Sequence, residues 1–449
     1  MQYNEDSDIN GCYFLSLKVE NIACFGNPQT LDLSCDGKPA RWTVIIGDNG
    51  AGKTTLLRCL AGISPYSIDN PDTMTFQTTD LNWKFKKKEG LQSGVEAIFA
   101  VNWKFTAKKR EFPTAHRKYI ERIITQIAPP DFSSTIEFPE TAVVSDLYFK
   151  KFKFICYGYG AARRMSSSKI LTEKGEFAAR SLFDDNASLI NAEEWLLQLD
   201  YISTKDRKYL KYRKQVEDII INLLPDVTKI DYRIEKNISK VIFETPSGWV
   251  GIDQLGLGYR TMLTWMVDFA ARLFERYPDS KNPLAEPAIL LLDEIDLHLH
   301  PKWQRTIIDY LTGKFPNTQF IVTAHSPLLV QSAEGANLVL LRRQGSESII
   351  DNDPVSVKNW RVDQILTSDL FGVESTRSKE TQQLFNERTR LLSKGTLSQK
   401  DMENLAELER QMADVPFGDT KEEIEADFLI KKIAAKIRKP NTGKESPDD

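Results

Sequence analysis

The residues with the clearest chemical meaning form one short segment, Val44–Thr55, which reads Val-Ile-Ile-Gly-Asp-Asn-Gly-Ala-Gly-Lys-Thr-Thr. A β-branched apolar run leads into a glycine-rich turn, and a helical pattern follows it. Gly47, Gly52, Lys53 and Thr54 have the spacing of a phosphate-binding loop. In such a loop, glycines let backbone N–H groups surround an anion, a lysine reaches the β- and γ-phosphates, and a hydroxyl ligates Mg²⁺.

We therefore predict that this segment binds ATP together with Mg²⁺. The alternative is a glycine-rich turn between a strand and a helix that binds nothing. The Lys-Thr pair directly after the second glycine argues against that alternative. The residues predicted to contact the nucleotide are Gly47, Asn49, Gly50, Ala51, Gly52, Lys53, Thr54 and Thr55, with Thr54 also on the metal.

A second chemical element is the apolar run Ala288–Leu292, which is followed by Asp293 and Glu294. An unbroken apolar run predicts a buried parallel strand, and such strands deliver the residues after them to the sheet edge where phosphate-binding loops lie. We predict that Asp293 holds Mg²⁺ through water and that Glu294 is the general base toward the attacking water. The alternative is an ordinary strand end with two solvated acids.

A third element is His325, in the string Thr-Ala-His-Ser-Pro that ends the predicted strand Gln319–Thr323. At the end of a neighbouring strand, this side chain would donate a hydrogen bond to the γ-phosphate and sense its presence. The alternative is a satisfied surface or core histidine. The chain has 4 histidines, and His298 and His300 also follow Asp293 closely, so we favour the functional interpretation.

A second glycine-rich turn, Leu255–Arg260, precedes the apolar helix predicted over Thr261–Phe274. Glycines before a helix N-terminus make a turn suited to an anion. One loop already cradles a triphosphate, so we predict that Gly256 and Gly258 face the γ-phosphate of a partner subunit. Two ATP molecules would then be sandwiched between two chains.

The order of these motifs resembles the ABC-type ATPases of the RecF and SMC branch. The strings Asp293–Pro301 and Thr323–Pro327 resemble its short members without a coiled-coil arm, which act in bacterial DNA repair and antiphage defence. Asp369–Ser378 resembles a segment of the ATPase subunit of Septu-type defence systems, which works with an HNH nuclease. The family's roles carry over where residues match, and the matching residues are Lys53, Thr54, Asp293, Glu294 and His325.

The resemblance also implies ATP-sandwiched homo-oligomers, a separately encoded HNH-type nuclease partner, and a loop over Asp296–His300 that crosses the dimer interface. One departure concerns Gly256, because the family usually has a serine there whose hydroxyl binds the opposing γ-phosphate. The loss of that hydrogen bond predicts slow hydrolysis, with ATP acting mainly as a switch. The family's glutamine loop has only Gln77 and Gln92 as candidates.

The predicted fold class is α/β: an ABC-type P-loop ATPase head with a mixed sheet, N-terminal antiparallel strands, a helical insert and a C-terminal helical region. We also predict a helix over His116–Ala128 and another over Pro301–Leu311. The predicted parts are an N-terminal ATPase lobe over residues 1–164, a helical insert and hairpin over 165–250, a second ATPase lobe over 251–345, and a C-terminal partner or oligomerisation region with a disordered tail over 346–449.

Composition limits the remaining functions. A net charge of −4 over 449 residues gives no global attraction to nucleic acid or to an anionic membrane. The 5 scattered cysteines, none in a CxxC pair, indicate reduced thiols in a cytoplasmic protein and argue against a zinc site. The apolar runs are too short to span a bilayer, so we expect no membrane partner.

Direct contact with DNA would need a local basic surface. Aromatic and basic residues interleave in one part of the chain, and Arg163 and Arg164 lie either near phosphates or DNA or in a solvated loop. The residues of the interleaved patch are Trp83, Lys84, Lys86, Lys87, Lys88, Lys104, Lys108, Lys109, Arg110, Arg117 and Lys118. Three functions stay open: the ATPase subunit of a defence complex, a RecF-like repair ATPase that binds DNA, and a structural scaffold that retains ATP.

Overall fold

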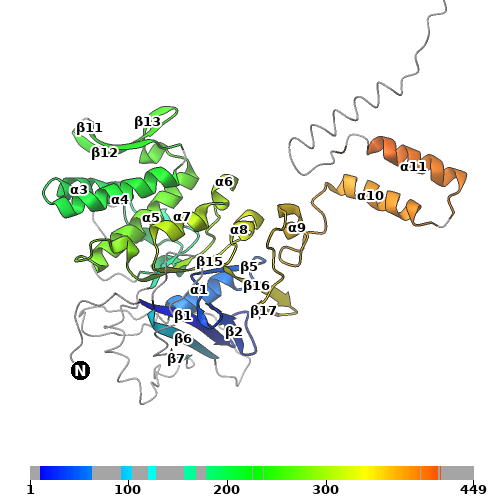
Figure 1. Cartoon of the computed structure of the whole chain (residues 1–449), viewed down its shortest axis with the longest axis horizontal. Coiled ribbons are helices and arrows are strands. Elements are labelled where there is room, and N and C mark those ends of the chain that lie inside the picture. Colours follow the sequence, from blue (N-terminus) through cyan, green and yellow to red (C-terminus); the bar gives the residue numbers. More distant parts are fainter. Residues whose placement is uncertain are drawn as a thin grey trace, which may run out of the picture. The chain divides into compact units, whose positions relative to one another are not determined.

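The structure is a computed structural model, which describes residues 11–62, 93–103, 120–127, 156–167, 178–224, 226–235, 237–394, 396–412 and 415. Its contacts divide it into two compact units, Met1–Gly372 and Val373–Asp449 (Figure 1). The four-part division expected from the sequence is finer than this split and stays a prediction.

A six-stranded sheet forms the centre of the first unit, in the order β17-β16-β5-β15-β14-β8. Its strands are parallel except for β17, which runs antiparallel to β16. Because β5 and β14 are parallel, the loops that follow them emerge at the same sheet edge, on either side of β15. The strands are β5 (Trp42–Gly47), β8 (Cys156–Tyr159), β14 (Ala288–Leu292), β15 (Thr318–Thr323), β16 (Asn337–Gln344) and β17 (Glu347–Asp351).

Side chains alternate across this sheet and fill two separate hydrophobic clusters. In β14, Ile289 and Leu291 belong to one cluster, whereas Leu290 and Leu292 belong to the other. All five residues of β14 are buried, as expected for a strand with packed layers on both faces. The same alternation continues past the strand, so Asp293 is expected on the face of Ile289 and Leu291.

An antiparallel sheet and one helix cover that face. The sheet has the order β2-β1-β6-β7. Helix α1 (Lys53–Gly62) buries Leu56, Leu57 and Leu60 in the same cluster as Leu17 of β1. The strands are β1 (Gly11–Glu20), β2 (Gln29–Asp32), β6 (Ser93–Trp103) and β7 (Ile120–Ile127), beside a small pair, β3 (Ser34–Cys35) and β4 (Lys38–Pro39). The predicted mixed sheet with N-terminal antiparallel strands is confirmed.

The helix predicted over His116–Ala128 is wrong. Residues Ile120–Ile127 form strand β7. This strand pairs with β6 from Ser93↔Ile127 to Ala100↔Ile120. Its isoleucines have a helical spacing, but β-branched side chains favour a strand, and β6 would otherwise leave its backbone groups unpaired at the sheet edge.

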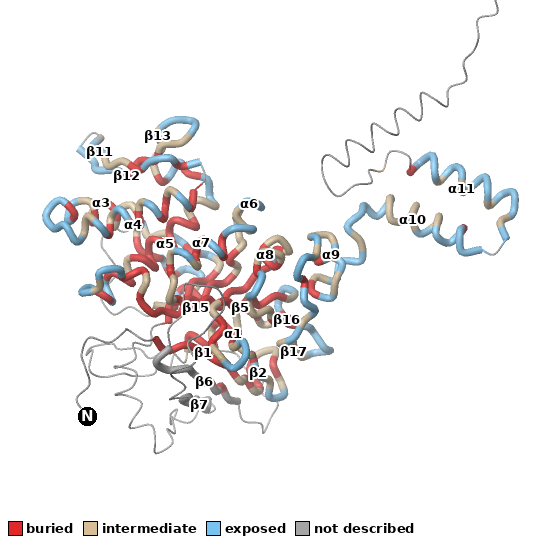
Figure 2. Tube along the Cα trace, in the orientation of Figure 1, coloured by how far each residue is buried: buried red, intermediate tan, exposed pale blue. Residues whose placement is uncertain are grey.

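Helices cover the opposite face of the central sheet. The longest, α5 (Leu257–Arg276), is buried along most of its length (Figure 2). The helix predicted over Pro301–Leu311 is broken into α6 (Pro301–Gln304) and α7 (Ile307–Lys314). The predicted helical insert is present as α3 (Ala192–Ser203) and α4 (Arg207–Leu223), followed by the three-stranded sheet of β11 (Lys229–Glu235), β12 (Ile238–Thr245) and β13 (Gly248–Gly251).

Short elements complete the first unit. They are β9 (Arg164–Met165), η2 (Arg180–Leu182), β10 (Ser188–Leu189), η3 (Ile252–Gln254), η4 (Pro283–Ala285), α8 (Pro327–Ser332) and α9 (Val362–Leu366). Among the described residues, none of the helices combines the length and the apolar character needed to cross a membrane.

A buried polar network fastens β8 to α5. The Tyr159 hydroxyl donates to Oδ2 of Asp268 at 2.7 Å, and Nε of Arg272 donates to the same oxygen at 2.7 Å. The backbone N–H of Ile190 donates to the other carboxylate oxygen at 3.2 Å. Asp268 is completely buried, so these three donors are what makes its charge tolerable there. The network fixes the end of β8, from which the next loop departs.

The second unit contains a helical hairpin. Helix α10 (Lys379–Leu392) begins at the N-cap Ser378, and α11 (Gln399–Gln411) begins at the N-cap Ser398. Both caps accept a backbone hydrogen bond through their side chains. The predicted C-terminal helical region is therefore confirmed for these two helices. The later part of the predicted C-terminal region, residues 416–449, lies outside the described residues.

Candidate nucleotide-binding site

The loop between β5 and α1 needs its glycines for two physical reasons. Gly47, Gly50 and Gly52 have φ values of 144°, 76° and 98°, which other residues rarely adopt. A Cβ at Gly47 would also lie 2.5 Å from the carbonyl oxygen of Leu341, and one at Gly52 would lie 2.5 Å from Sγ of Cys24. The glycines thus allow the loop to curl tightly while packed against its neighbours.

Lys53 lies over this loop with its ammonium group turned inward. Its Nζ donates to the carbonyl oxygens of Gly47 at 2.7 Å and Asp48 at 2.9 Å. Burial lowers the pKa of the ammonium group, and the carboxylates of Asp293 and Glu294 oppose that shift. A buried cation beside a glycine cradle suits a phosphate group, so the residues present fit an anionic ligand.

The hydroxyl of Thr54 meets the carboxylate of Asp293. Thr54 Oγ1 donates to Asp293 Oδ2 at 2.7 Å, and Thr323 Oγ1 donates to Asp293 Oδ1 at 2.6 Å. Thr54 is the second residue of α1, whereas Asp293 directly follows β14 on the face that the alternation along that strand predicts. The structure therefore joins the two residues predicted as metal ligands, and hydroxyl and carboxylate oxygens suit Mg²⁺.

Glu294 occupies a strained turn directly after this carboxylate. Its φ is 49°, in the left-handed region that costs a non-glycine residue roughly 1 kcal/mol or more. The turn is held by three hydrogen bonds: Glu294 N–H to Thr323 Oγ1 at 2.7 Å, Ile295 N–H to the Thr323 carbonyl at 3.0 Å, and Leu297 N–H to the Glu294 carbonyl at 3.1 Å. The predicted base thus extends from a backbone that its neighbours hold in one conformation.

Arg163 contacts the backbone of this turn, a position that the sequence pattern does not single out. Only 2% of the residue is exposed, so it is neither a solvated loop residue nor free to contact DNA. Its Nε donates to the Gly160 carbonyl at 3.1 Å, and its Nη2 donates to the carbonyls of Asp293 and, at 2.7 Å, Glu294. Burial lowers its pKa to about 10, against the opposing field of nearby carboxylates. The one sequence signal for this residue is the Gly-Tyr-Gly-Ala-Ala-Arg-Arg string over Gly158–Arg164, which begins within β8.

His325 lies in a loop that is tied to the segment after Glu294. Its backbone N–H donates to Asp296 Oδ2 at 3.0 Å, while the residue itself is exposed. The next residue, Ser326, donates its hydroxyl to Gln304 Oε1 at 2.7 Å, and Gln304 Nε2 donates to the Leu299 carbonyl at 3.0 Å. The structure thus brings the histidine loop to the Asp296–His300 segment, and the catalytic role of His325 stays a prediction.

The second glycine turn contacts the same segment. Helix α5 begins at Leu257, directly after Gly256, four residues earlier than the pattern predicted. A Cβ at Gly258 would lie 2.4 Å from the carbonyl oxygen of His298, so only glycine allows this approach. A Cβ at Gly256 would meet nothing within 4 Å. That these glycines face a partner subunit's phosphate stays a prediction.

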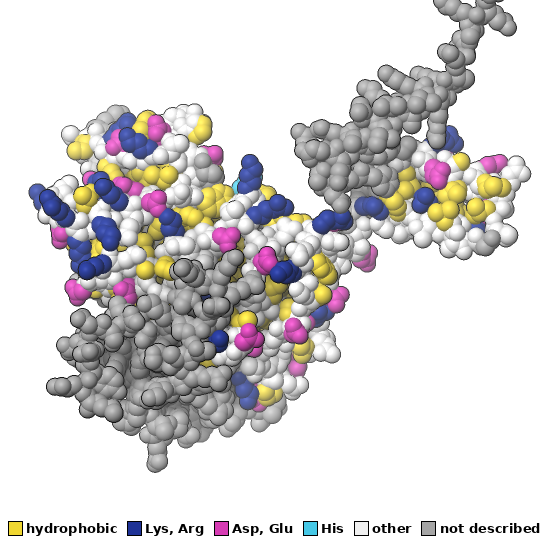
Figure 3. Space-filling view, in the orientation of Figure 1, with side chains coloured by type: hydrophobic (Ala, Val, Ile, Leu, Met, Phe, Trp, Pro, Cys, Tyr) yellow, Lys and Arg dark blue, Asp and Glu magenta, His cyan; other side chains and the backbone are white. Residues whose placement is uncertain are grey.

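The predicted basic patch, from Trp83 to Lys118, lies outside the described residues, as do the glutamine candidates Gln77 and Gln92. On the face seen in Figure 3, described basic side chains over α3 and α4 stand among acidic ones. Ion pairs such as Arg213–Asp200 and Lys314–Asp218 contribute to this mixed charge.

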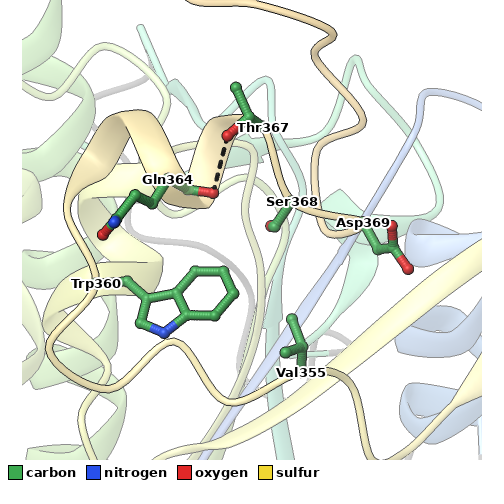
Figure 4. A pocket seen from close by; sticks show the side chains of 6 residues that line it. All are labelled: Val355, Trp360, Gln364, Thr367, Ser368 and Asp369. Carbon is green, nitrogen blue, oxygen red and sulfur yellow. Dashed lines mark hydrogen bonds between the residues drawn. The ribbon is translucent and has the colours of Figure 1, made fainter.

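A separate hollow of about 460 Å³ lies near the end of the first unit (Figure 4). The Thr367 hydroxyl donates to the Gln364 carbonyl there at 3.3 Å, and Asp369 pairs with Arg342 at 3.4 Å. It is lined by Val355, Trp360, Gln364, Thr367, Ser368 and Asp369. None of these residues belongs to the predicted nucleotide site.

Comparison with known proteins identifies the family. The family model described as "AAA domain, putative AbiEii toxin, Type IV TA system" matches residues 42–331, from β5 to α8. The chain belongs to this family. The match covers the glycine loop, the Asp-Glu pair and the histidine loop, so the predicted α/β P-loop ATPase fold is confirmed.

Several curated relatives are similar over long stretches. The Vibrio cholerae protein named Retron Vc95 probable ATPase is 26% identical over 380 residues, which cover 72% of this chain and 73% of the relative. The Septu protein PtuA of Bacillus mycoides is 25% identical over 377 residues, covering 83% of this chain but 46% of the relative. This chain therefore spans less than half the length of that Septu protein. The predicted likeness to an ABC-type ATPase of the Septu kind is confirmed.

Two further similarities are more limited. The Escherichia coli protein named Retron Ec83 probable ATPase is 39% identical over 127 residues, which cover 28% of this chain and 23% of the relative. The solved SMC head domain from Thermotoga maritima is 15% identical, with a TM-score of 0.41, covering 76% of this chain and 100% of that one.

Lys53→Ala should weaken ATP binding by at least ~30-fold, because breaking a buried, hydrogen-bonded charge pair costs about 2–5 kcal/mol. Isothermal titration with ATP and Mg²⁺ measures the change. Lys205→Ala, an exposed lysine between α3 and α4, is the matched control and should bind ATP as the wild type does. Equal affinities of Lys53→Ala and the wild type would refute the phosphate-loop assignment.

The two glycines of the second turn should respond differently to substitution. A serine side chain at position 256 has room, so Gly256→Ser should fold normally. The variant restores the hydroxyl that is usual in the family. We expect ATP turnover to rise several-fold, because the hydroxyl adds roughly one charge-assisted hydrogen bond to the γ-phosphate. Gly258→Ala should lower the thermal midpoint, because its Cβ meets the His298 carbonyl. Turnover assays and circular dichroism melts check both. A Gly256→Ser variant slower than the wild type would contradict the predicted serine role.

Proposed function

We propose that this chain is the ATP-binding and ATP-hydrolysing regulatory subunit of a bacterial antiphage defence complex. The observation that carries the ATPase part is the hydrogen bond from Thr54 to Asp293, which joins two motifs 239 residues apart. The defence part rests on the relatives named Septu protein PtuA and Retron Vc95 probable ATPase.

The chain's own groups divide the work of binding. The glycine loop with Lys53 would hold the phosphates of ATP, and Thr54 with Asp293 would hold Mg²⁺. Bound Mg²⁺ neutralises charge that builds up on the phosphates during transfer. Thr323 keeps the Asp293 carboxylate in place through its own hydroxyl.

Glu294 would take the proton of the attacking water. It is half-buried and follows the metal-binding carboxylate directly, so base and metal ligand share one rigid turn. His325, exposed at the end of β15, would contact the γ-phosphate. Its loop is bonded to Asp296, so loss of that phosphate would be felt by the segment after Glu294.

Dimerisation would complete the site. The exposed Gly256 and the 56% exposed Leu257 stand at the N-terminus of α5, where backbone N–H groups are unpaired and favour an anion. We propose that this turn closes over the ATP of a second copy, and that the closed dimer controls a separately encoded HNH-type nuclease. With Gly256 in place of the usual serine, hydrolysis is slow and occupancy is the main signal.

Glu294→Gln should bind ATP without hydrolysing it and should accumulate as an ATP-bound dimer. Turnover should fall by at least ~100-fold, since a positioned general base contributes about 10²–10⁴-fold. Light scattering coupled to gel filtration, with and without ATP, measures the association. Glu334→Gln, on an exposed carboxylate paired with Lys358, is the matched control. A Glu294→Gln variant hydrolysing ATP at the wild-type rate would exclude this residue as the base.

Removal of the second unit should separate nucleotide binding from partner binding. A chain ending at Gly372 keeps the whole of the first unit, including the buried Leu370, and should bind ATP with unchanged affinity. We expect it to lose its oligomer or nuclease contacts, because the amphipathic α10 and α11 are absent. Purification from the native host, with mass spectrometry of co-purified proteins, measures this loss.

Three results separate the proposal from its rivals: the co-purified proteins, DNA binding, and the assembly of the Glu294→Gln variant. Recovery of a small nuclease with the full chain, but not with the shortened one, supports the defence complex. ATP-dependent DNA binding without any partner would favour a repair ATPase instead. Tightly retained ATP, with no change in assembly on Glu294→Gln, would favour a structural scaffold.

A further inference from the structure

We propose that Arg163 is a positioning residue that fixes the backbone turn from which the Glu294 side chain extends. This inference rests on the proposed ATPase function and deepens it. Arg163 contacts backbone carbonyls and not the predicted nucleotide ligands' side chains, so it would act through Glu294 and Asp293.

The peptide unit between Asp293 and Glu294 is clamped at both ends. Its carbonyl oxygen accepts a hydrogen bond from Nη2 of Arg163. Its N–H donates to the hydroxyl of Thr323 at 2.7 Å. A peptide unit held at both its oxygen and its nitrogen cannot rotate, so the plane on the N-terminal side of Glu294 Cα is fixed.

The next peptide unit is held by the same guanidinium. Nη2 of Arg163 also donates to the Glu294 carbonyl at 2.7 Å. With both flanking planes fixed and a φ of 49°, the Cα–Cβ bond of Glu294 has one direction only. Because this backbone conformation is strained, it persists only where its surroundings enforce it.

Arg163 is itself rigidly placed. It follows β8, which the Tyr159–Asp268 hydrogen bond ties to α5, and its Nε donates to the Gly160 carbonyl. Its own φ is 37°, so its backbone is held in the left-handed region too. A planar guanidinium, unlike an ammonium group, holds its N–H donors in a fixed fork. Here Nη2 donates to both successive carbonyls while Nε donates to the Gly160 carbonyl, so three bonds hold the guanidinium in place.

The buried charge of Arg163 also lies near the carboxylates of the acidic turn. Burying an arginine is costly unless it is paired, and among the described residues its Nη1 is buried without a hydrogen-bond partner. Three carboxylates, those of Asp293, Glu294 and Asp296, are near enough to stabilise its charge. A fixed cation is therefore kept beside the acidic turn, in addition to the Lys53 ammonium group at the glycine loop.

The neighbouring arginine supplies a matched control. Arg164 follows directly, as the first residue of β9, but is exposed, and its Nη1 lies 3.5 Å from Oδ1 of Asn186. Arg163→Met keeps the length and the apolar stem but removes the fork. Arg163→Lys keeps the charge and loses the fork, and Arg164→Met removes an equivalent charge from the surface.

The test measures kcat and KM for ATP in the wild type and these three variants, with circular dichroism melts for folding. Arg163→Met should lower kcat by at least ~30-fold, since displacing a catalytic group by about 1 Å costs roughly 100-fold. KM should stay within about threefold, because the glycine loop and Lys53 hold the phosphates. Arg163→Lys should be intermediate, and Arg164→Met should match the wild type.

A folded Arg163→Met with kcat within threefold of the wild type would overturn the proposal, as would an equal loss in kcat and in ATP affinity. If Arg163→Met does not fold, Arg163→Lys decides, and an unchanged kcat there overturns it. A wild type that turns over no ATP would refute the proposed function and this inference with it. If the wild type turns over ATP and the Arg163→Met substitution leaves kcat unchanged, the positioning role alone is refuted.

Discussion

The carboxylate of Asp293 is the group on which the rest of the site depends. It accepts one hydrogen bond from the helix after the glycine loop and one from the end of β15, at 2.7 Å and 2.6 Å. Three segments far apart in the sequence therefore meet at one pair of oxygens. An unpaired carboxylate would be costly at a site only 5% exposed, so the folded core itself requires the hydroxyls of Thr54 and Thr323 to be there. The contacts that stabilise the sheet edge are therefore the same ones that would hold the proposed metal ion.

Most of this edge could be predicted from the sequence because its signals are local. The glycine spacing identifies the loop, and the apolar runs identify β14 and β15 with errors of one residue at most. Parallel order then brings Thr54, Asp293 and His325 to one edge without further information. Strand β7 could not be predicted in this way, because its isoleucine spacing fits a helix and only pairing with β6 decides otherwise.

Arg163 was also beyond prediction, and for a different physical reason. A pair of arginines after a glycine-rich turn indicates solvent or phosphate, since an arginine is rarely buried without a charged partner. Here backbone carbonyls from another strand end supply the acceptors, and the strand pairing of β8 with β14 brings them within reach. Such a role depends on which strands are neighbours, and no local pattern encodes that. The exposed Arg164, one residue later, has the same local signal and a different environment.

The segment from Asp293 to His300 contacts the other parts of the site through its backbone and its carboxylates. Arg163 and Thr323 hold its start, the histidine loop is bonded to Asp296, and Gly258 touches the His298 carbonyl. A close-packed segment of this kind cannot shift at one contact without straining its other contacts. Under the proposed function, a phosphate bound or lost at the glycine loop would therefore be felt at the N-terminus of α5, the turn proposed to meet a second copy. The proposed coupling between nucleotide and assembly would need no long path in this fold, because this one segment contains the proposed base, Glu294, and contacts both the histidine loop and the glycine turn.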